Sequence, residues 1–115
     1  MSLELDDMIR WAAAKESSDI FLKANAAPAI RLHGKIVPTD YPMLSAEEVH
    51  RLAFSKMNPR QQAIFEQHHE MDLAFSVGED IRIRMNVYNQ RGHTATVCRI
   101  IPTLIKPLEE LGIPA

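Results

Sequence analysis

The chain has 115 residues, of which 46% are hydrophobic and 24% charged, an ordinary composition for one globular domain. Its apolar runs are far shorter than the roughly 20 residues of a membrane-spanning helix, and the single cysteine, Cys98, excludes an internal disulfide. The formal net charge of −2 is unevenly distributed along the chain. Residues 1–80 include 8 basic and 13 acidic side chains, whereas residues 81–115 include 5 basic and 2 acidic ones.

The first third of the chain is predicted to form one helix and three strands. Apolar residues recur with a helical period over 4–16, which predicts an amphipathic helix that ends before Ser17 and Ser18. Short apolar segments predict strands at 19–23, 29–32 and 35–37. Gly34 is the natural turn residue between the last two strands, which therefore form a hairpin.

Two helix starts follow in quick succession. Ser45, with Glu48 three residues later, has the pattern of a capping box and opens a helix that we expect to reach about Met57. Asn58 repeats the signal, because it is followed by proline and then by glutamine at the third helical position. This second helix is predicted to end near residues 68–69.

Alternating apolar residues predict three further strands, at 71–77, 81–88 and 94–101. Short turns join them, the second at 89–93, so they form an antiparallel meander. The order α-β-β-β-α-α-β-β-β predicts an α+β domain with a single, mainly antiparallel sheet and helices packed on one face. We expect this domain to occupy residues 1–102. Residues 103–115 contain further prolines and no clear period, and we expect them to be a linker toward another domain.

One face of the strand at 81–88 is polar and basic. Alternation places Arg82, Arg84, Asn86 and Tyr88 on that face, with neighbouring side chains about 7 Å apart. Arginine is a fixed cation with a planar fork of donors that matches phosphate oxygens. Periodicity alone favours a different interpretation, the solvated face of an edge strand whose arginines pair with acids on the neighbouring strand, such as Glu70 or Asp72.

Several kinds of active site are absent from the sequence. The four glycines are isolated, so no phosphate-binding loop of the G-x-x-x-x-G-K-[ST] type exists, and we expect this chain by itself to hydrolyse nothing and to hold no cofactor. His68 and His69 lie near acidic residues, but adjacent helical side chains diverge, so a solvated helix end is favoured over a metal site. Cys98 lies in a β-branched run and is interpreted as a buried small hydrophobe rather than a nucleophile.

Five segments together resemble one known family. They are SSDIFL at 17–22, PAIR at 28–31, EMDLAF at 70–75, RIRMNVYNQRG at 82–92 and CRIIP at 98–102. In this order they resemble the N-terminal domain of twitching-motility (pilus retraction) ATPases of the PilT/PilU type, in the type II/type IV secretion ATPase superfamily. The segment LEELG at 108–112 looks like the part that leads into the catalytic domain of that family. Phe21 stands where the family often has histidine, which leaves retraction motor and accessory paralogue both open.

The resemblance implies a PAS-like fold for this domain and a RecA-like ATPase domain beyond the linker. ATP binds between these two domains in the family, and arginines of the N-terminal domain contact its terminal phosphate. Carried over residue by residue, Arg84 and Arg99 are the best candidates for such arginine fingers, and Arg82 is a third. No catalytic residue and no metal ligand is carried over to this chain.

The resemblance also implies what surrounds the domain. The full-length protein is expected to bind ATP and Mg²⁺ and to form a homohexamer in which this domain contacts its own RecA-like domain and neighbouring subunits. The motor is expected to be cytoplasmic, held at the inner membrane by the platform of the type IV pilus, where it powers pilus retraction. No nucleic acid is expected as a partner.

Three other interpretations remain open. A PAS-like fold also suits a small-molecule sensor, which would need a hollow core. The arginine face suits a nucleic-acid-binding module, although the net charge is negative and only Tyr88 is expected to offer a stacking surface on that face. The domain also fits a pure assembly module, in which Arg84 and Arg99 pair with acids of a neighbouring subunit.

Overall fold

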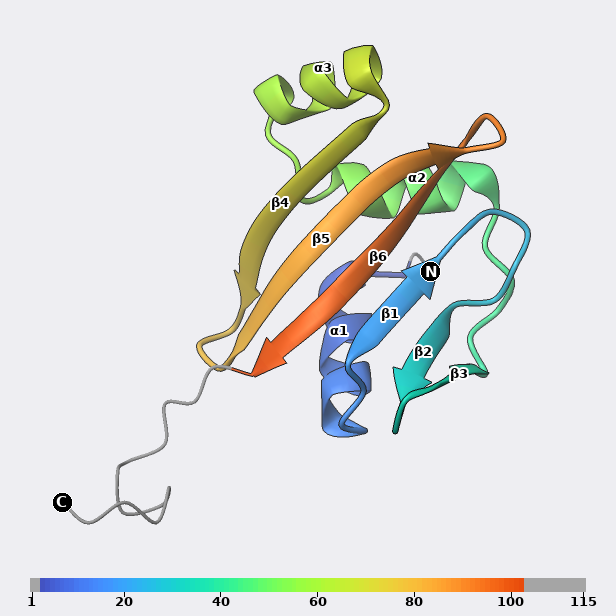
Figure 1. Ribbon diagram of the computed structural model, residues 1–115, viewed down its shortest axis with the longest axis vertical. Coiled ribbons are helices and arrows are strands. Elements are labelled where there is room, and N and C mark those ends of the chain that lie inside the picture. Colours follow the sequence, from blue (N-terminus) through green and yellow to red (C-terminus); the bar gives the residue numbers. More distant parts are fainter. Residues whose placement is uncertain (1–2, 103–115) are drawn as a thin grey trace, which may run out of the picture.

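The computed structural model describes residues 3–102 of the chain. The nine elements follow the predicted order: α1 (Leu5–Ala14), β1 (Asp19–Leu22), β2 (Ala29–Leu32), β3 (Lys35–Pro38), α2 (Ala46–Phe54), α3 (Pro59–His68), β4 (Glu70–Val77), β5 (Ile81–Gln90) and β6 (His93–Pro102). The six strands form one sheet in the order β3-β2-β1-β6-β5-β4, and every neighbouring pair is antiparallel (Figure 1). The predicted α+β class with a single antiparallel sheet is therefore confirmed. The linker predicted at 103–115 lies outside the described residues.

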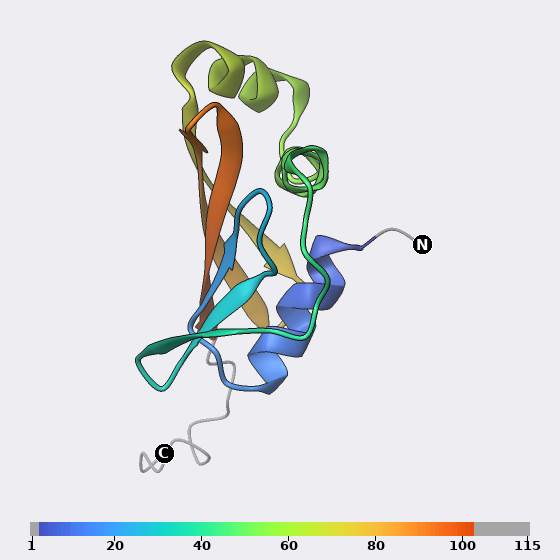
Figure 2. The ribbon, with the colours of Figure 1, turned by 90° about the vertical axis from the view of Figure 1, so that its right-hand side faces the viewer.

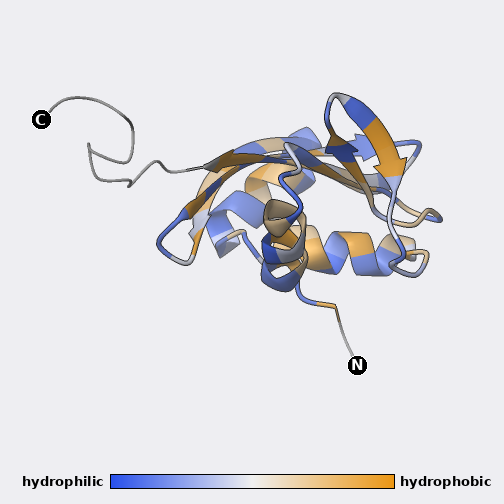
Figure 3. Ribbon diagram, turned by 90° about the horizontal axis from the view of Figure 1, so that it is seen from below, coloured by the Kyte–Doolittle hydropathy of each residue, from blue (hydrophilic) through white to orange (hydrophobic). Residues whose placement is uncertain are grey.

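Helices cover one face of the sheet. Figure 2 shows α1 and α2 on the same side of the strands, with α3 beyond α2 at one end, and Figure 3 shows the other side of the sheet free of helices. The core lies between these two layers, because alternate residues of the strands face the helices. Its largest fully buried side chains include Met8 and Ile9 of α1, Leu52 of α2, and Ile83 and Met85 of β5.

Capping explains where the second and third helices begin. The Ser45 hydroxyl accepts from the Glu48 amide at 3.1 Å while the Glu48 carboxylate accepts from the Ser45 amide at 3.1 Å, which completes the predicted capping box. Asn58 caps α3 in the same way with Gln61. The predicted end of α2 near Met57 is wrong by one turn. The helix ends at Phe54, since the chain needs the intervening residues to turn before Asn58 starts α3.

The hairpin between β5 and β6 is tighter than predicted. A five-residue turn was expected at 89–93, but the ladder continues to the pair Gln90 and His93, so the turn consists of Arg91 and Gly92. Both turn residues have positive φ, 52° and 83°, which matches the twist of paired strands. An arginine rarely adopts this conformation, so its sequence did not signal a two-residue turn. The longer ladder holds β5 and β6 together over their full lengths.

Within the described part of the chain, no helix is long and apolar enough to cross a membrane.

Candidate functional site

The candidate site lies on the face of the sheet that the helices leave uncovered, which we call the open face. On β5 the side chains of Ile83, Met85 and Val87 are buried toward the helices, so the residues between them belong to the open face. Arg82 and Arg84 are exposed there. The predicted alternation of this strand is confirmed, and it brings the two arginines onto one surface.

Register aligns three arginines and one aspartate across four strands. Arg84 of β5 is the cross-strand partner of Arg99 of β6, Arg99 is the partner of Asp19 of β1, and Asp19 is the partner of Arg31 of β2. Residues directly opposite each other in an antiparallel sheet point to the same face. We call these four residues the arginine row. It runs across the four neighbouring strands β2, β1, β6 and β5 of the sheet (Figure 1).

Asp19 is the anionic centre of the arginine row. Its side chain is 5% exposed, and its two oxygens accept from Arg99 Nε and Arg31 Nε, each at 3.2 Å. The Ser18 hydroxyl donates a third hydrogen bond at 2.8 Å. A buried carboxylate is stable only when it is paired and hydrogen-bonded, so these three donors account for its place in the sheet.

Arg84 differs from Arg99 in its surroundings. Among residues 3–101 no carboxylate forms an ion pair with Arg84, and its direct neighbour across the ladder is another arginine. It lines two shallow hollows of the open face, of about 330 and 380 Å³. Arg99 shares the first hollow and Arg82 the second. Asp72 also lines both hollows, but its carboxylate already accepts a hydrogen bond from the Asn86 side chain, so an anion that approaches Arg84 meets two other cations beside it and one engaged acid.

The alternative in which the arginines pair with Glu70 or Asp72 is wrong for this structure. Asp72 instead accepts a hydrogen bond from Nδ2 of the Asn86 side chain at 2.9 Å. The carboxylate that forms an ion pair with Arg99 belongs to Asp19. Sequence reasoning missed Asp19 and Arg31 as members of the site. The available signal was their place in the segments at 17–22 and 28–31, two of the five that resemble the ATPase family.

The open face also carries two aromatic rings rather than one. Tyr88 lies on it as expected, but Phe21 lies there too, because its cross-strand partner is Val97 on the same face. The expectation that only Tyr88 offers a stacking surface is therefore wrong. The Arg31 guanidinium lies over the Phe21 ring at 5.5 Å, a cation–π contact that covers part of the ring.

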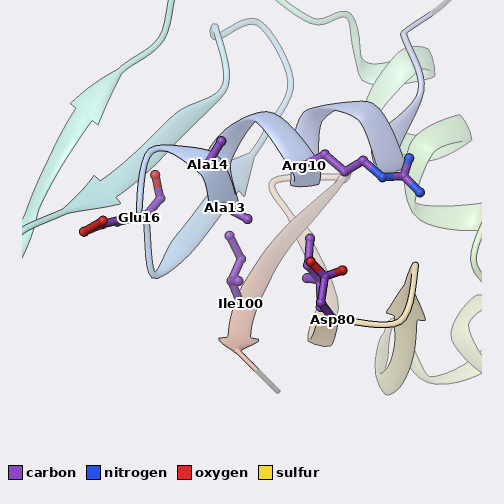
Figure 4. Close-up of a pocket in the computed structure, with 8 residues that line it drawn as sticks. Arg10, Ala13, Ala14, Glu16, Asp80 and Ile100 are labelled. Atoms are coloured by element: carbon purple, nitrogen blue, oxygen red, sulfur yellow. The ribbon is translucent and has the colours of Figure 1, made fainter. Parts of the chain in front are cut away.

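A larger hollow of about 610 Å³ lies away from the arginine row, between α1 and the adjoining ends of β5 and β6. Figure 4 shows Arg10 and Asp80 on one side of it, and Ala13 of α1 close to Ile100 of β6. None of the arginine row lines it. Its charged residues are of both signs, which favours no single class of ligand.

The remaining chemically interesting residues show no active-site geometry. Burial raises the pKa of the Cys98 thiol from its ordinary 9.0 to about 12, so at neutral pH the group is a protonated thiol and a poor nucleophile. In the part of the chain that the structure describes, no three histidine, cysteine or acidic side chains gather as metal ligands do. His69 instead ends α3 in a left-handed conformation with φ of 62°.

Comparison with known proteins finds relatives among type IV pilus ATPases. Over 111 residues the chain is 32% identical to the type IV pilus retraction ATPase PilT of Pseudomonas aeruginosa, which covers 96% of this chain and 32% of that protein. A twitching motility protein of Neisseria gonorrhoeae is 34% identical over 94% of the chain and 29% of the relative. A crystal structure of the pilus retraction motor PilT with bound ADP superimposes with a TM-score of 0.83 at 35% identity, over 98% of this chain and 33% of that one.

The chain is homologous to the N-terminal domain of PilT-type ATPases. It spans about a third of the length of these relatives. PilU of Pseudomonas aeruginosa, a type IV pilus ATPase, is almost as similar, at 31% identity over 97% of the chain and 29% of that protein. The PilT-type fold extends to the Legionella pneumophila ATPase DotB, with a TM-score of 0.74 at 20% identity over 99% of this chain and 33% of that one. No protein-family model matches the sequence.

Proposed function

We propose that this chain is the nucleotide-covering domain of a PilT-type ATPase motor that drives type IV pilus retraction. In this proposal the open face lies against ATP bound by a RecA-like domain of the same hexamer. The names of the relatives support it, since PilT is a type IV pilus retraction ATPase and a crystal structure of the PilT motor contains ADP. The phosphate-binding loop would come from the RecA-like domain, because this chain has none.

The observation that carries the proposal is the position of Arg84 beside Arg99 on the open face, where Arg84 forms no ion pair with any of residues 3–101. Like charges placed directly opposite each other destabilise a sheet, so two facing arginines need a reason other than stability. Negative charge on the terminal phosphate oxygens of ATP supplies that reason. A pair of guanidinium forks can donate to several phosphate oxygens at once, which stabilises the charge that develops during phosphoryl transfer.

Arg82 takes a secondary part in this proposal. It lies two residues before Arg84 on the same face of β5, and its cross-strand neighbours are Ser76 and Ile101 rather than other charges. At roughly 7 Å from Arg84 it is close enough to add to the positive potential without sharing the same phosphate oxygen. We therefore assign contact with the terminal phosphate to Arg84 and Arg99, and long-range attraction to Arg82.

The same proposal defines cofactor, assembly and location. The full-length protein would bind ATP with Mg²⁺, form a homohexamer, and work in the cytoplasm on the inner-membrane platform of the pilus. Closure of this domain over the nucleotide would depend on ATP, because the arginine pair is attracted by the phosphates only in the closed arrangement. The resulting rotation of one domain against the other would be the mechanical step.

The test compares ATPase turnover, ATP affinity and hexamer formation in the full-length protein for Arg84→Ala and Arg99→Ala. Arg60→Ala is the matched control, since Arg60 is an exposed arginine at the start of α3. We expect both site variants to assemble and bind ATP but to turn over at least ~100-fold more slowly, a loss of about 2.7 kcal/mol in transition-state stabilisation. Unchanged turnover with a dissociated ring would instead identify the arginines as assembly residues. If neither turnover nor assembly changed, the arginines would have neither the phosphate-binding role nor the assembly role.

A further inference from the structure

Asp19 is the single charged residue that is buried among residues 3–101, and it lies on the face that has no helices. No helix or strand among residues 3–102 lies over it there. What shields its carboxylate from water is the pair of arginines on the strands to either side, together with Ser18. The two arginines therefore bury the Asp19 carboxylate themselves, and the three side chains form one hydrogen-bonded cluster.

The way in which the arginines are held is specific. Both donate to Asp19 through Nε, at 3.2 Å, and each uses a different carboxylate oxygen. A guanidinium has five N–H donors, so this arrangement leaves the two terminal amino groups of each arginine for another acceptor. The Arg99 side chain is 70% exposed although it is tied at Nε, which means that its terminal donors are open to solvent.

The charges of the row also indicate more than a structural tie. Asp19 compensates one of the two cations that flank it, so the trio of Arg31, Asp19 and Arg99 keeps a net charge of +1 and adjoins Arg84. A structural ion pair would need one arginine only. Arg31 holds the carboxylate from the strand on the opposite side. This restricts the positions of the Asp19 carboxylate and therefore those of the Arg99 side chain bound to it.

We propose that Asp19 is the positioning residue of the arginine site. It fixes Nε of Arg99 so that the terminal amino groups of this arginine meet the phosphate of a nucleoside triphosphate. Arg31 holds the other carboxylate oxygen of Asp19 in place. This inference rests on the proposed function, and it assigns a role to the Ser-Asp pair at 18–19. Fixing a flexible arginine in advance removes the loss of side-chain freedom that would otherwise oppose phosphate binding.

The test uses the full-length protein with Asp19→Asn, which keeps the shape of the side chain and removes its charge. We expect kcat to fall roughly 10-fold to 100-fold, because a misplacement of about 1 Å in a positioned group costs up to about 100-fold, while KM for ATP changes far less. The effect should vanish in the Arg99→Ala background, since no arginine then remains to be positioned. Asp19→Glu, which retains the charge, should recover part of the lost turnover.

Glu70→Gln is the matched control, because Glu70 is an exposed acid on the open face of β4, where it faces Tyr88. It changes the net charge equally and should leave kcat unchanged. If Arg99→Ala slows turnover but Asp19→Asn does not, the positioning role is wrong and the proposed function stands. If Arg99→Ala itself has no effect, Arg99 makes no catalytic contact, and both the positioning role and that part of the proposed function fail.

A second measurement covers the case in which Asp19→Asn does not fold in the full-length protein. In the 115-residue chain, the Nε–H signals of Arg31 and Arg99 can be followed by nuclear magnetic resonance. We expect both to exchange slowly with solvent and both to exchange faster in Ser18→Ala, which removes one hydrogen bond from the same carboxylate. Fast exchange of Arg99 Nε–H in the unmodified chain would mean that its guanidinium is not held, and would overturn the proposal.

Discussion

Arg84 and Arg99 face each other across the β5–β6 ladder, yet of these two only Arg99 forms an ion pair with a carboxylate among residues 3–101. The two residues therefore make opposite contributions to the stability of the domain. Arg84 adds cross-strand repulsion and forms no ion pair among residues 3–101, whereas Arg99 neutralises the buried Asp19. A residue that weakens the fold and remains exposed is typical of a binding surface, because selection for function then outweighs its cost in stability.

The stability of the 115-residue chain should reflect this difference. Arg84→Ala should leave the free energy of unfolding unchanged or raise it by a few tenths of a kcal/mol, since a cross-strand repulsion is relieved. Arg99→Ala should lower it by about 1 kcal/mol, because one oxygen of the buried Asp19 loses its donor while Arg31 and Ser18 remain. Urea unfolding followed by circular dichroism measures both. An equal loss in the two variants would show that Arg84 has a structural partner.

The geometry of the guanidinium should matter as much as its charge. Arg84→Lys retains the cation but replaces the planar fork with a single ammonium group, which cannot bind two phosphate oxygens side by side. We expect turnover of the full-length protein to fall at least ~10-fold with little change in the stability of the domain. Arg60→Lys is the control and should be neutral. Full activity of Arg84→Lys would indicate that Arg84 acts through its charge alone.

The buried thiol should make stability depend on pH in the alkaline range. Burial raises the pKa of Cys98 to about 12, so the unfolded chain loses this proton first as the pH rises. The stabilising contribution is complete below pH ~8 and is lost between about pH 9 and 12, by at most about 1.4 kcal/mol per pH unit.

Comparison with Cys98→Ala isolates this contribution. Lysine and tyrosine side chains titrate in both proteins, so the difference between the two unfolding free energies should shrink as the pH rises from about 8 to 10. A thiol reagent at pH ~8 should label native Cys98 far more slowly than the urea-unfolded chain. Equal labelling rates would contradict its burial.

The cap of α2 provides a test that does not involve the open face. Ser45→Ala removes the acceptor for the Glu48 amide and should lower the free energy of unfolding by about 1 kcal/mol. Ser45→Asp is the matched variant, since aspartate is an equally good cap and should be nearly neutral. Thermal or urea unfolding distinguishes them. No loss in Ser45→Ala would mean that water replaces the hydroxyl at this helix end.

Phe21 and Tyr88 on the same face as the arginines make nucleic acid binding a question for experiment. We expect none beyond weak, salt-sensitive association, because Arg31 covers part of the Phe21 ring and the chain has a net charge of −2. Fluorescence anisotropy of a labelled single-stranded oligonucleotide measures it. A dissociation constant below ~1 µM at about 150 mM salt, weakened by Phe21→Ala, would instead support the nucleic-acid interpretation.

The sequence predicted those features that depend on short-range pattern. The alternation at 81–88 fixed the faces of β5, because a strand repeats every two residues and one face of this strand is buried. Ser45 and Asn58 identified two helix starts, since a cap acts within three residues. Arg84 was placed on the correct surface by the same local reasoning. Its role toward nucleotide stays a prediction.

Features that depend on distant parts of the chain were not predictable. Asp19 meets Arg31 and Arg99 through the pairing of three strands, and a single sequence does not reveal which strands are neighbours or in what register. Phe21 was missed for the same reason. The positive φ at Arg91 was missed because the ladder, rather than the local preference of arginine, imposes the tight turn.

The first strand of the sheet in chain order, β1, pairs with β6, the last strand of the described part of the chain. This pairing affects how the domain folds during its synthesis. β1 is paired with β6 on one side, and the residues Asp19 and Arg99 that meet there are 80 positions apart. At the usual rate of translation, roughly 4 to 16 seconds pass between the synthesis of β1 and that of its partner β6. During this time the edge of β1 that will pair with β6 is unpaired. An exposed strand edge is a template for pairing with another chain, so this interval is the one in which the nascent domain is most exposed to wrong pairing, and the arginine row can form only after β6 has been made.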